Sequence, residues 1–313
     1  MTSLEYTTRE RTPNGIAQRS ERFTVVASST SPTVLKRWVA FELRKLREDA
    51  GISRDGAAKA IKGSVQNIGH IETARSLPKP LELERLLELY GVPERSEFFL
   101  ELRTRAKKGR DWWIGFDEST VPEYFKLFLG LESSAVKIES WDAIVIPGLF
   151  QTPDYARAII RGGRPEFRAT EVEKRVELRM ARQGEVLDQE DAPQVWAVIS
   201  EAALRLEVGS RAILRAQLER LLELREYPNI ELQVMPASAG AHTGVDGGFI
   251  VLTFPNELAH DPGCVYVEGR VKGVYYEEPV QVLAYRDVLT RLQMRADKPE
   301  DFPRWVKEAM KDL

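Results

Sequence analysis

Residues 51–75, GISRDGAAKAIKGSVQNIGHIETAR, predict two short helices joined by a tight turn at Lys62-Gly63. Ser53 offers its side-chain oxygen as the N-cap of the first helix, and Ser64 caps the second. Each helix then has a small apolar inner face, formed by Ala57, Ala58 and Ile61 in the first and by Ile68 and Ile71 in the second. Such a pair is typical of a helix-turn-helix, which presents the end of its second helix to the major groove of DNA.

Amphipathic segments on both sides complete a small helical domain. Before the pair, one helical stripe is formed by Val39, Leu43, Leu46 and Ala50 and ends at Gly51. Trp38 is expected to pack on this domain. After the pair, the prolines of residues 77–80 predict a bend, followed by a helix that ends at Gly91 and a fifth helix over residues 94–108. We therefore expect an all-α, five-helix domain over residues 33–110.

Polar side chains at the start of the second short helix are candidates for DNA recognition. Amide groups suit paired hydrogen bonds to adenine edges, and an aliphatic side chain suits a thymine methyl group. The candidates for base contacts are Val65, Gln66, Asn67 and His70, and those for phosphate contacts are Arg54, Lys62, Ser64, Arg75 and Lys79. The alternative is an ordinary solvated face of a helical bundle. The order of N-cap, turn and second N-cap, with the basic phosphate-contact candidates around them as a basic rim, favours DNA binding.

Charge is distributed unevenly along the chain. Residues 33–110 hold 17 Lys and Arg and 11 Asp and Glu, a net charge of +6, whereas residues 111–313 have a net charge of −10. A basic segment joined to an acidic one is typical of a nucleic-acid-binding domain fused to a domain with another role. Chance asymmetry between two solvated surfaces is the alternative.

The remaining composition indicates a soluble, cytoplasmic protein. Cys264 is the only cysteine, so no intramolecular disulfide can form. The first thirty residues lack the apolar segment of a secretory signal, and no apolar run is long enough to span a bilayer. We expect residues 1–32 to form a flexible arm with a short strand at residues 23–27.

Beyond Asp111, apolar β-branched runs alternate with long helical patterns. Five strands are expected, at residues 136–144, 194–200, 230–235, 248–254 and 264–268, with helices at 122–131, 153–161, 170–187, 210–225, 279–295 and 299–311. Thr170 and Glu173 predict a capping box, and the glycines of residues 240–248 predict a hairpin loop. Residues 111–313 are thus expected to form an α+β domain, which makes the chain α+β overall.

Residues 39–91 resemble the XRE, or Cro-type, helix-turn-helix family. The similarity rests on Gly51-Ile52-Ser53 and on the run from Ser64 to Arg75. Three positions depart from the family, which usually has Gln in place of Arg54, a polar residue in place of Val65 and Gly in place of Ala74. The resemblance implies the DNA-binding fold, with a phosphate contact from Arg54 in place of an amide contact.

Residues 111–313 resemble the C-terminal domain of a group of actinobacterial XRE regulators that are often called antitoxin-like. The similarity rests on residues 145–156, 175–183, 200–204, 217–221, 233–236, 240–242 and 265–268. It implies a DNA-binding regulator, repressor-like in action, that is modulated by a small acidic partner protein encoded next to it. We expect a homodimer that places two recognition helices one helical turn apart on an inverted-repeat operator. The alternative is a regulator whose C-terminal domain senses a cationic or amphipathic small molecule.

A proline-glycine turn in this domain is a candidate surface for the partner or ligand. Thr152 is a plausible N-cap with Pro153 at the first helical position. The candidate contact residues are Pro147, Leu149, Phe150, Gln151 and Tyr155. Apolar side chains next to a turn are either part of the core or part of an exposed groove, and the core is the commoner outcome.

No motif in the sequence predicts an enzyme. His70, His242 and His260 are too scattered for a zinc site, and no phosphate-loop, dinucleotide-binding or serine-hydrolase pattern occurs. We therefore expect no cofactor and no metal. Glu139, Glu201 and Glu268 lie in or next to predicted strands and would suit acid–base chemistry if they converged. They are more simply surface carboxylates, and Cys264 is most simply a buried strand residue.

Overall fold

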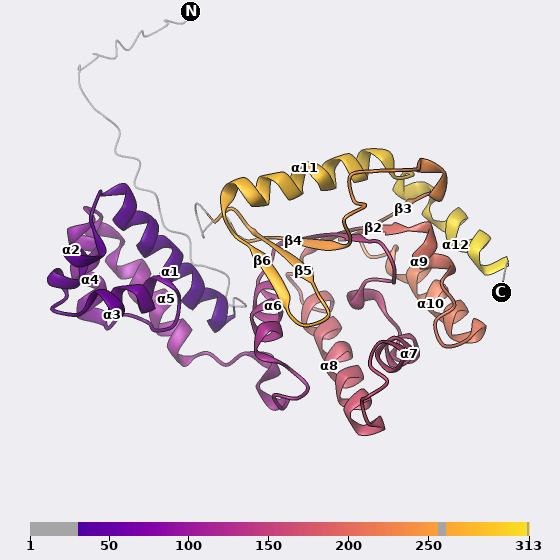
Figure 1. The fold of residues 1–313 in the computed structure, drawn as a ribbon, viewed down its shortest axis with the longest axis horizontal. Coiled ribbons are helices and arrows are strands. Elements are labelled where there is room, and N and C mark those ends of the chain that lie inside the picture. Colours follow the sequence, from indigo (N-terminus) through magenta and orange to yellow (C-terminus); the bar gives the residue numbers. More distant parts are fainter. Residues whose placement is uncertain (1–30, 256–260, 312) are drawn as a thin grey trace, which may run out of the picture.

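The computed structural model describes residues 31–255, 261–311 and 313. A helical domain comes first and is followed by an α+β domain built on one mixed sheet (Figure 1). The predicted N-terminal arm, with its strand at residues 23–27, lies almost entirely outside the described residues. Within the described residues, no helix is both long and apolar enough to cross a membrane.

The helical domain contains the five helices expected from the sequence. They are α1 (Pro32–Asp49), α2 (Arg54–Ala60), α3 (Val65–Glu72), α4 (Pro80–Leu89) and α5 (Ser96–Lys108). The first helix begins at Pro32, seven residues before the predicted stripe, because Ser31 accepts a hydrogen bond from the backbone N–H of Thr33 and acts as its N-cap. The fifth begins after a 3₁₀ turn, Pro93–Arg95, rather than at residue 94.

Local signals place the two short helices as the sequence predicts. The side-chain oxygens of Ser53 and Ser64 each accept a backbone N–H at 3.1 Å, from Gly56 and Asn67. Gly51 ends α1 with φ of +68°, a left-handed conformation that is least costly for glycine. The turn between α2 and α3 is left-handed at Lys62, with φ of +55°.

Trp38 anchors the core of the helical domain. Its side chain is fully buried, with ring centroids 5.7 Å from Phe98 and 5.5 Å from Phe99 on α5. Ile68 and Ile71 of α3 are buried in the same cluster. The inner face of α3 is therefore fixed by packing, which leaves its outer face free for contacts.

The α+β domain is built on a six-stranded sheet with the order β3-β2-β1-β4-β5-β6. The strands are β1 (Lys137–Asp142), β2 (Gln194–Ser200), β3 (Ile230–Met235), β4 (Phe249–Thr253), β5 (Cys264–Glu268) and β6 (Gly273–Tyr276). The first three are parallel, and β4, β5 and β6 are each antiparallel to their neighbours. The parallel half is connected by helices, as parallel strands require.

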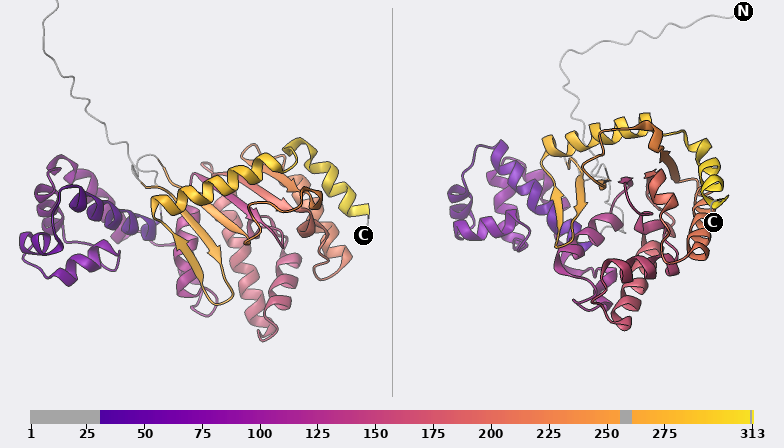
Figure 2. Two further views of the ribbon diagram at one scale, coloured as in Figure 1. Left: turned by 45° about the horizontal axis from the view of Figure 1, so that its top comes forward. Right: turned by 45° about the vertical axis from the view of Figure 1, so that its right-hand side comes forward.

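Helices cover both faces of the sheet (Figures 1 and 2). On one side lie α6 (Glu123–Ser133), α7 (Pro153–Gly163), α8 (Ala169–Leu187) and α10 (Arg211–Leu224), and on the other lies α11 (Pro279–Arg295). The short α9 (Glu201–Arg205) follows β2, and α12 (Phe302–Lys311) packs on α10. Burial alternates along the strands accordingly: Cys264 and Tyr266 join the cluster on the α8 side, and Val265 joins the cluster under α11.

The structure corrects three details of the predicted domain. The sheet has six strands rather than about five, because the four-residue edge strand β6 is too short to stand out in the sequence. Residues 240–248 do not form a hairpin loop, because the strands that they connect, β3 and β4, are not neighbours in the sheet: β2 and β1 lie between them. The predicted capping box is also wrong. Helix α8 begins one residue earlier, and the side chain of Glu171 accepts the backbone N–H of Arg168 at 2.8 Å.

The start of α1 joins the two domains. The hydroxyl of Thr33 donates to the Asp111 carboxylate at 2.7 Å, and the backbone N–H of Ser31 donates to Ser134 Oγ at 2.9 Å. Farther along the helix, Arg37 forms ion pairs with Glu277 at 2.5 Å and Asp261 at 3.4 Å. Apolar side chains of both domains belong to one continuous buried cluster. The helical domain is thus fixed to the sheet domain through α1 and α6.

Candidate nucleic-acid interface

The outer face of α3 is exposed at its N-terminal end. Val65 is 48% exposed, Gln66 is also exposed, and Asn67 and His70 are half-buried. The helical domain contacts the sheet domain through α1, whereas α3 lies on the side away from it (Figure 1). The four candidates for base contacts therefore lie together on a surface that the sheet domain does not cover. An exposed helix end of this kind fits the major groove.

The start of α3 also suits a phosphate group. Ser64 Oγ accepts the N–H of Asn67, so its capping role is confirmed, and its phosphate contact stays a prediction. The first N–H groups of a helix have no partner within the helix and carry the positive end of its dipole. A nucleic-acid phosphate at this position would be stabilised by both effects.

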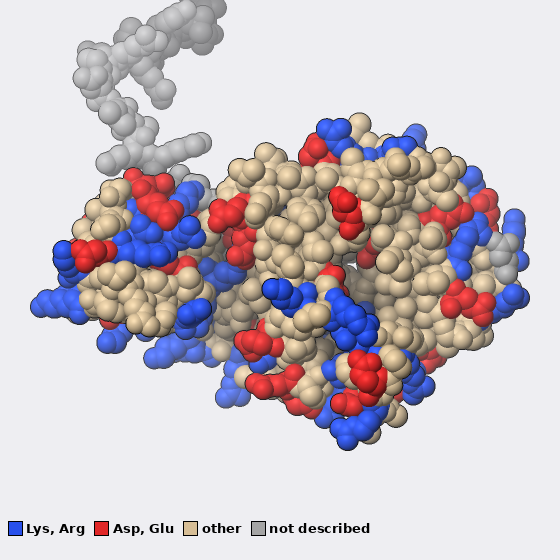
Figure 3. All heavy atoms as spheres, viewed as in Figure 1, with Lys and Arg blue, Asp and Glu red and all other residues tan. Residues whose placement is uncertain are grey.

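The residues predicted to contact phosphates differ in their exposure and in their ion pairs in the free protein. Lys62 and Arg75 are exposed. The Lys79 side chain is 81% exposed, and its ion pair with Glu82 is long, at 3.8 Å. Arg54 instead forms an ion pair with Glu72 at 2.8 Å, although its side chain remains 45% exposed. Lys and Arg side chains line the outer edge of the helical domain in Figure 3. The rim can therefore supply positive charge to a DNA backbone without unfolding any part of the domain.

A buried charge network holds α1, α2 and α3 together, and the sequence analysis did not find it. The Glu72 carboxylate, with 2% of its side chain exposed, accepts hydrogen bonds from Arg47 Nε at 2.6 Å and from Arg54 Nε at 2.8 Å. These bonds to Glu72 raise the pKa of Arg47 above its usual value. Each residue alone resembles an ordinary surface charge, so no local pattern could have revealed the network. It fixes the C-terminal end of α3 while the N-terminal end stays exposed.

Replacing Lys62 or Arg75 with Ala should weaken binding to every duplex by a similar factor. Phosphate contacts carry no sequence information, and each one removed should reduce the slope of log affinity against log salt by about 1. The measurement is a salt titration of binding to two unrelated duplexes. Lys307→Ala, an exposed lysine on α12, is the matched control and should change neither value. A loss confined to one duplex would contradict the assignment of Lys62 and Arg75 to phosphates.

The proline-glycine turn of the sheet domain is part of the core, so its assignment as a partner or ligand surface is corrected. Pro147, Leu149, Phe150, Gln151 and Tyr155 are all buried. The Gln151 side chain donates to the Ile146 carbonyl at 2.8 Å, and Gln217 donates to that of Phe150 at 2.8 Å. Thr152 caps α7 as expected, accepting the N–H of Tyr155 at 3.3 Å. Of the two alternatives for this turn, the core and an exposed groove, the structure shows the core.

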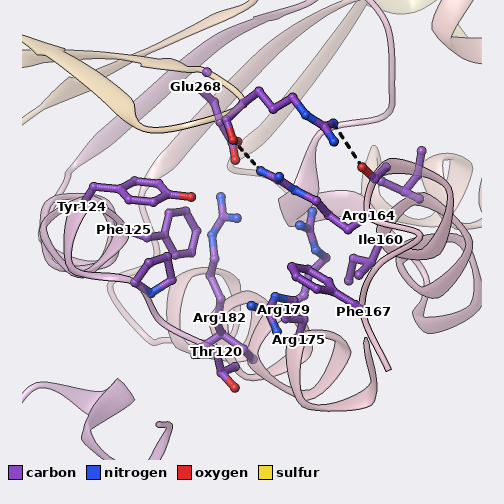
Figure 4. A pocket seen from close by; sticks show the side chains of 16 residues that line it. Thr120, Tyr124, Phe125, Ile160, Arg164, Phe167, Arg175, Arg179, Arg182 and Glu268 are labelled. Carbon is purple, nitrogen blue, oxygen red and sulfur yellow. Dashed lines mark hydrogen bonds between the residues drawn. The ribbon is translucent and has the colours of Figure 1, made fainter. Parts of the chain in front are cut away.

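A cavity of about 440 Å³ lies between α6, α7, α8 and the end of β5 (Figure 4). Its charged lining consists of Arg164, Arg175, Arg179, Arg182, Arg270 and Glu268, and its apolar lining includes Tyr124, Phe125, Ile159, Ile160, Phe167 and Leu178. Its side chains come from α6, α7, α8, β5 and the adjoining loops, so no single stretch of the sequence predicts it. The cavity lies just beyond the buried turn, since Arg179 Nη1 donates to Gln151 Oε1 at 3.0 Å.

Comparison with known protein families matches both domains. Residues 38–98 match a helix-turn-helix domain family, and residues 125–308, more than half of the chain, match the domain of unknown function DUF5753. The chain belongs to the DUF5753 family. The pair of domains is consistent with an XRE-type helix-turn-helix regulator that carries this C-terminal domain, and the helix-turn-helix supports a DNA-binding regulator. No curated protein and no solved structure matches the chain.

The three glutamates considered for acid–base chemistry do not form one site in the DUF5753 domain. Glu139 lies on the α11 face of the sheet, 3.6 Å from Arg286 and 3.3 Å from Gln293 of that helix. Glu268 lines the cavity on the opposite face, and Glu201 pairs with Arg205 at the start of α9. Cys264 is fully buried in β5, and burial raises the pKa of its thiol to about 12. No group of three or more metal-binding side chains gathers within residues 31–255 and 261–311.

Asp142, at the end of β1 in the DUF5753 domain, should make the stability of the protein depend on pH. Burial raises its pKa from 3.8 to about 7, although the carboxylate accepts a 2.5 Å hydrogen bond from Ser140. The folded state therefore binds this proton more tightly, so stability should fall as pH rises from about 4 to about 7. Asp142→Asn should be more stable than the wild type by roughly 1–3 kcal/mol at pH 8 and equal to it at pH 4.

Urea unfolding at both pH values tests the role of Asp142. Asp188→Asn, at an exposed aspartate after α8, is the control and should have the same free energy of unfolding as the wild type at either pH. A destabilised Asp142→Asn variant at pH 8 would show that the carboxylate is needed in its charged form.

Proposed function

We propose that the protein is a sequence-specific transcriptional regulator, repressor-like in action, whose α3 helix contacts bases in the major groove. The observation that carries the proposal is the exposed N-terminal end of α3, which carries Gln66 and Asn67 and has Lys62, Arg75 and Lys79 exposed near it. In Figure 1 this helix lies on the side of the helical domain away from the sheet. Amide side chains recognise base edges, whereas lysine and arginine at the rim bind phosphates regardless of sequence.

The regulator binds DNA as a homodimer in this proposal. One recognition helix covers only a few base pairs, so a specific site requires two copies one helical turn, about 34 Å, apart. Selection from a random duplex library should then enrich an inverted repeat with half-sites centred about 10 base pairs apart. Enrichment of single, unpaired half-sites would contradict the dimer, and no enrichment over random sequence would contradict specific recognition.

Modulation by a small acidic partner protein completes the proposal. The chain belongs to a family of unknown function, so this part rests on the resemblance to antitoxin-like regulators and on the joint between the domains. Because α1 of the helical domain is held by Asp111, Glu277 and the start of the sheet domain, a partner bound to the sheet domain can act on DNA binding through α1. Titration of the purified partner into a protein–DNA complex should change the affinity for DNA, and no change at saturation would contradict this part.

The second candidate function is a regulator that senses a small molecule. The cavity between α6 and α8 favours it, since pockets that hold small ligands have volumes of this order. In both versions the chain acts by binding rather than by catalysis. The arrangement of Glu139 and Glu268 on opposite faces of the sheet supports this, because acid–base catalysis needs its groups at one reacting centre.

A further inference from the structure

The cavity between α6 and α8 contains positive charge that the described part of the chain does not neutralise. Arg182 is paired with Glu132 and Arg164 lies 3.7 Å from Glu166, but Arg175, Arg179 and Arg270 form no ion pair within the described residues. We call these last three the arginine cluster. They are held by carbonyl or amide oxygens instead: Arg175 by Glu171, Arg179 by Gln151 and Arg270 by Gly163. One acidic side chain, Glu268, lines the same cavity.

Arg179 is the member of the cluster with a buried guanidinium nitrogen that has no hydrogen-bond partner. Its Nη1 donates to Gln151, but its Nε is buried and has no hydrogen-bond partner. Burial, together with the neighbouring Arg182 guanidinium, lowers the pKa of Arg179 to about 10. A buried donor without an acceptor is costly, and a guanidinium in this setting is stabilised most by an anion that takes two of its N–H groups.

Gly148 keeps the Arg179 guanidinium in this position. A Cβ atom at residue 148 would lie 2.6 Å from Arg179 Nη1 and 3.1 Å from Arg182 Nη1. The backbone of the proline-glycine turn therefore packs directly against both guanidiniums. The buried turn, a candidate ligand surface in the sequence, instead positions the residue that faces the cavity.

Apolar side chains form another part of the cavity wall. Phe125 of α6, Ile160 of α7 and Phe167 after α7 surround the arginine cluster, and we call these three the apolar wall (Figure 4). Arg175 stacks on Phe167, with 4.0 Å between its guanidinium carbon and the ring centroid. Charge and apolar surface therefore meet within one cavity, which is a combination that neither a simple salt nor a neutral hydrocarbon would satisfy.

We propose that this cavity binds a small amphipathic anion, with its carboxylate or phosphate group at Arg179 and its hydrophobic part on the apolar wall. The net charge of residues 111–313 led us to expect a cationic or amphipathic ligand, but the local charge at the cavity has the opposite sign and disfavours a cation. The proposal names the ligand class for the small-molecule version of the proposed function. Binding itself does not depend on that function, because it is measured without DNA.

The cavity also has a short route to the helical domain. Tyr124 and Phe125, which line it, belong to α6, and α6 packs against α1. The carbonyl of Tyr124 accepts a 2.6 Å hydrogen bond from Tyr275 of the edge strand β6. A ligand that shifts the start of α6 would therefore act on the helix that carries the DNA-binding domain.

Isothermal titration calorimetry on the full chain tests the binding proposal with two probes, octanoate and octyl phosphate. These share a hydrophobic chain and differ in the anionic group, so comparing them tells a carboxylate site from a phosphate site. Octan-1-ol keeps the chain without the charge, octylamine reverses the charge, and acetate and inorganic phosphate keep the charge without the chain. We expect one or both anionic probes to bind and the other four compounds to bind at least tenfold more weakly.

Two sets of variants, one at arginines and one at glycines, locate the site. Arg179→Gln should weaken binding of the anionic probe roughly tenfold or more, as for the loss of a charged hydrogen bond, and Arg179→Lys should restore part of it. Arg161→Gln, at a 57% exposed arginine on α7, is the matched control. Gly163→Trp should block the cavity, because glycine 163 lines it and a Cβ there meets no atom within 4 Å. Gly162→Trp, which is equally unhindered and outside the lining, should bind as the wild type does.

Clear outcomes would overturn the proposal. Equal binding of octanol, octylamine and octanoate would show that charge has no role, and no binding of either anionic probe would show that the ligand class is wrong. If Arg179→Gln does not fold, the two tryptophan variants decide the matter, since equal binding to both would place the ligand elsewhere. A protein that binds octanoate but no DNA would contradict the proposed function and leave the cavity proposal intact.

Discussion

Replacing Glu132 with Gln is expected to lower the free energy of unfolding by roughly 3–5 kcal/mol, the usual cost of breaking a buried ion pair. Glu132 of α6 and Arg182 of α8 are 1% and 7% exposed, and both Arg182 Nε and Nη2 donate to the carboxylate, Nη2 at 2.6 Å. The guanidinium also lies over the Phe128 ring, 5.0 Å from its centroid. The glutamine would leave the arginine charged and buried without its hydrogen-bonded carboxylate partner.

Urea unfolding measures this effect, with Glu223→Gln as the matched control. Glu223 pairs with Arg220 on α10 at 3.0 Å, but its side chain is 65% exposed, so its loss should cost about 1 kcal/mol or less. The double variant Glu132→Leu and Arg182→Met should recover much of the lost stability, because it removes both charges and not one. Equal effects of Glu132→Gln and Glu223→Gln would show that solvent reaches the buried pair.

Replacing Glu72 with Ala should lower the free energy of unfolding of the helix-turn-helix by roughly 3 kcal/mol, the lower end of the range for a buried ion pair. Glu72 accepts from Arg47 at 2.6 Å and from Arg54 at 2.8 Å, so it links α3 to both α1 and α2. Arg47 would keep two weaker partners, the Ile52 carbonyl at 2.9 Å and the half-exposed Glu48 at 3.1 Å, which moderate the loss.

Hydrogen exchange of backbone amides in residues 54–72 is the suitable measurement, because the two domains need not unfold together. Glu88→Ala on the exposed side of α4 is the control and should leave protection in that segment unchanged. Unchanged protection in Glu72→Ala would mean that apolar packing alone holds α3 in place.

Much of the fold could be predicted from local patterns. Three strands, Gln194–Ser200, Ile230–Met235 and Cys264–Glu268, have the bounds that their β-branched runs predicted. Serine caps set the starts of the short helices α2 and α3, and left-handed glycines, Gly51 and Gly91, follow α1 and α4. The edge strand β6 and the five-residue helix α9 were missed, because elements this short depend on pairing and packing with distant residues and not on their own sequence.

The candidate site was predictable only in part. The exposed end of α3 follows from the cap at Ser64 and the buried Ile68 and Ile71, which are all local signals. The network around Glu72 joins separate elements, and no spacing in the sequence marks it. Arg175, Arg179 and Arg182 do share one face of α8 at helical spacing, but the other walls of the cavity come from other elements. The candidate partner surface at Leu149 and Phe150 is core, the commoner of the two expected outcomes; an apolar turn has the same sequence pattern whether it is covered or exposed.

The central claim is that the amide side chains of α3 recognise bases, and it is tested most directly by measuring affinities for all single-base variants of the selected operator. These affinities are compared between the wild type and each of the variants Gln66→Ala and Asn67→Ala, at one salt concentration. We predict that each alanine variant loses roughly 1–3 kcal/mol at one position per half-site, no longer distinguishes bases there, and keeps the wild-type preferences elsewhere. An equal loss on every variant, with all preferences retained, would contradict base recognition by α3.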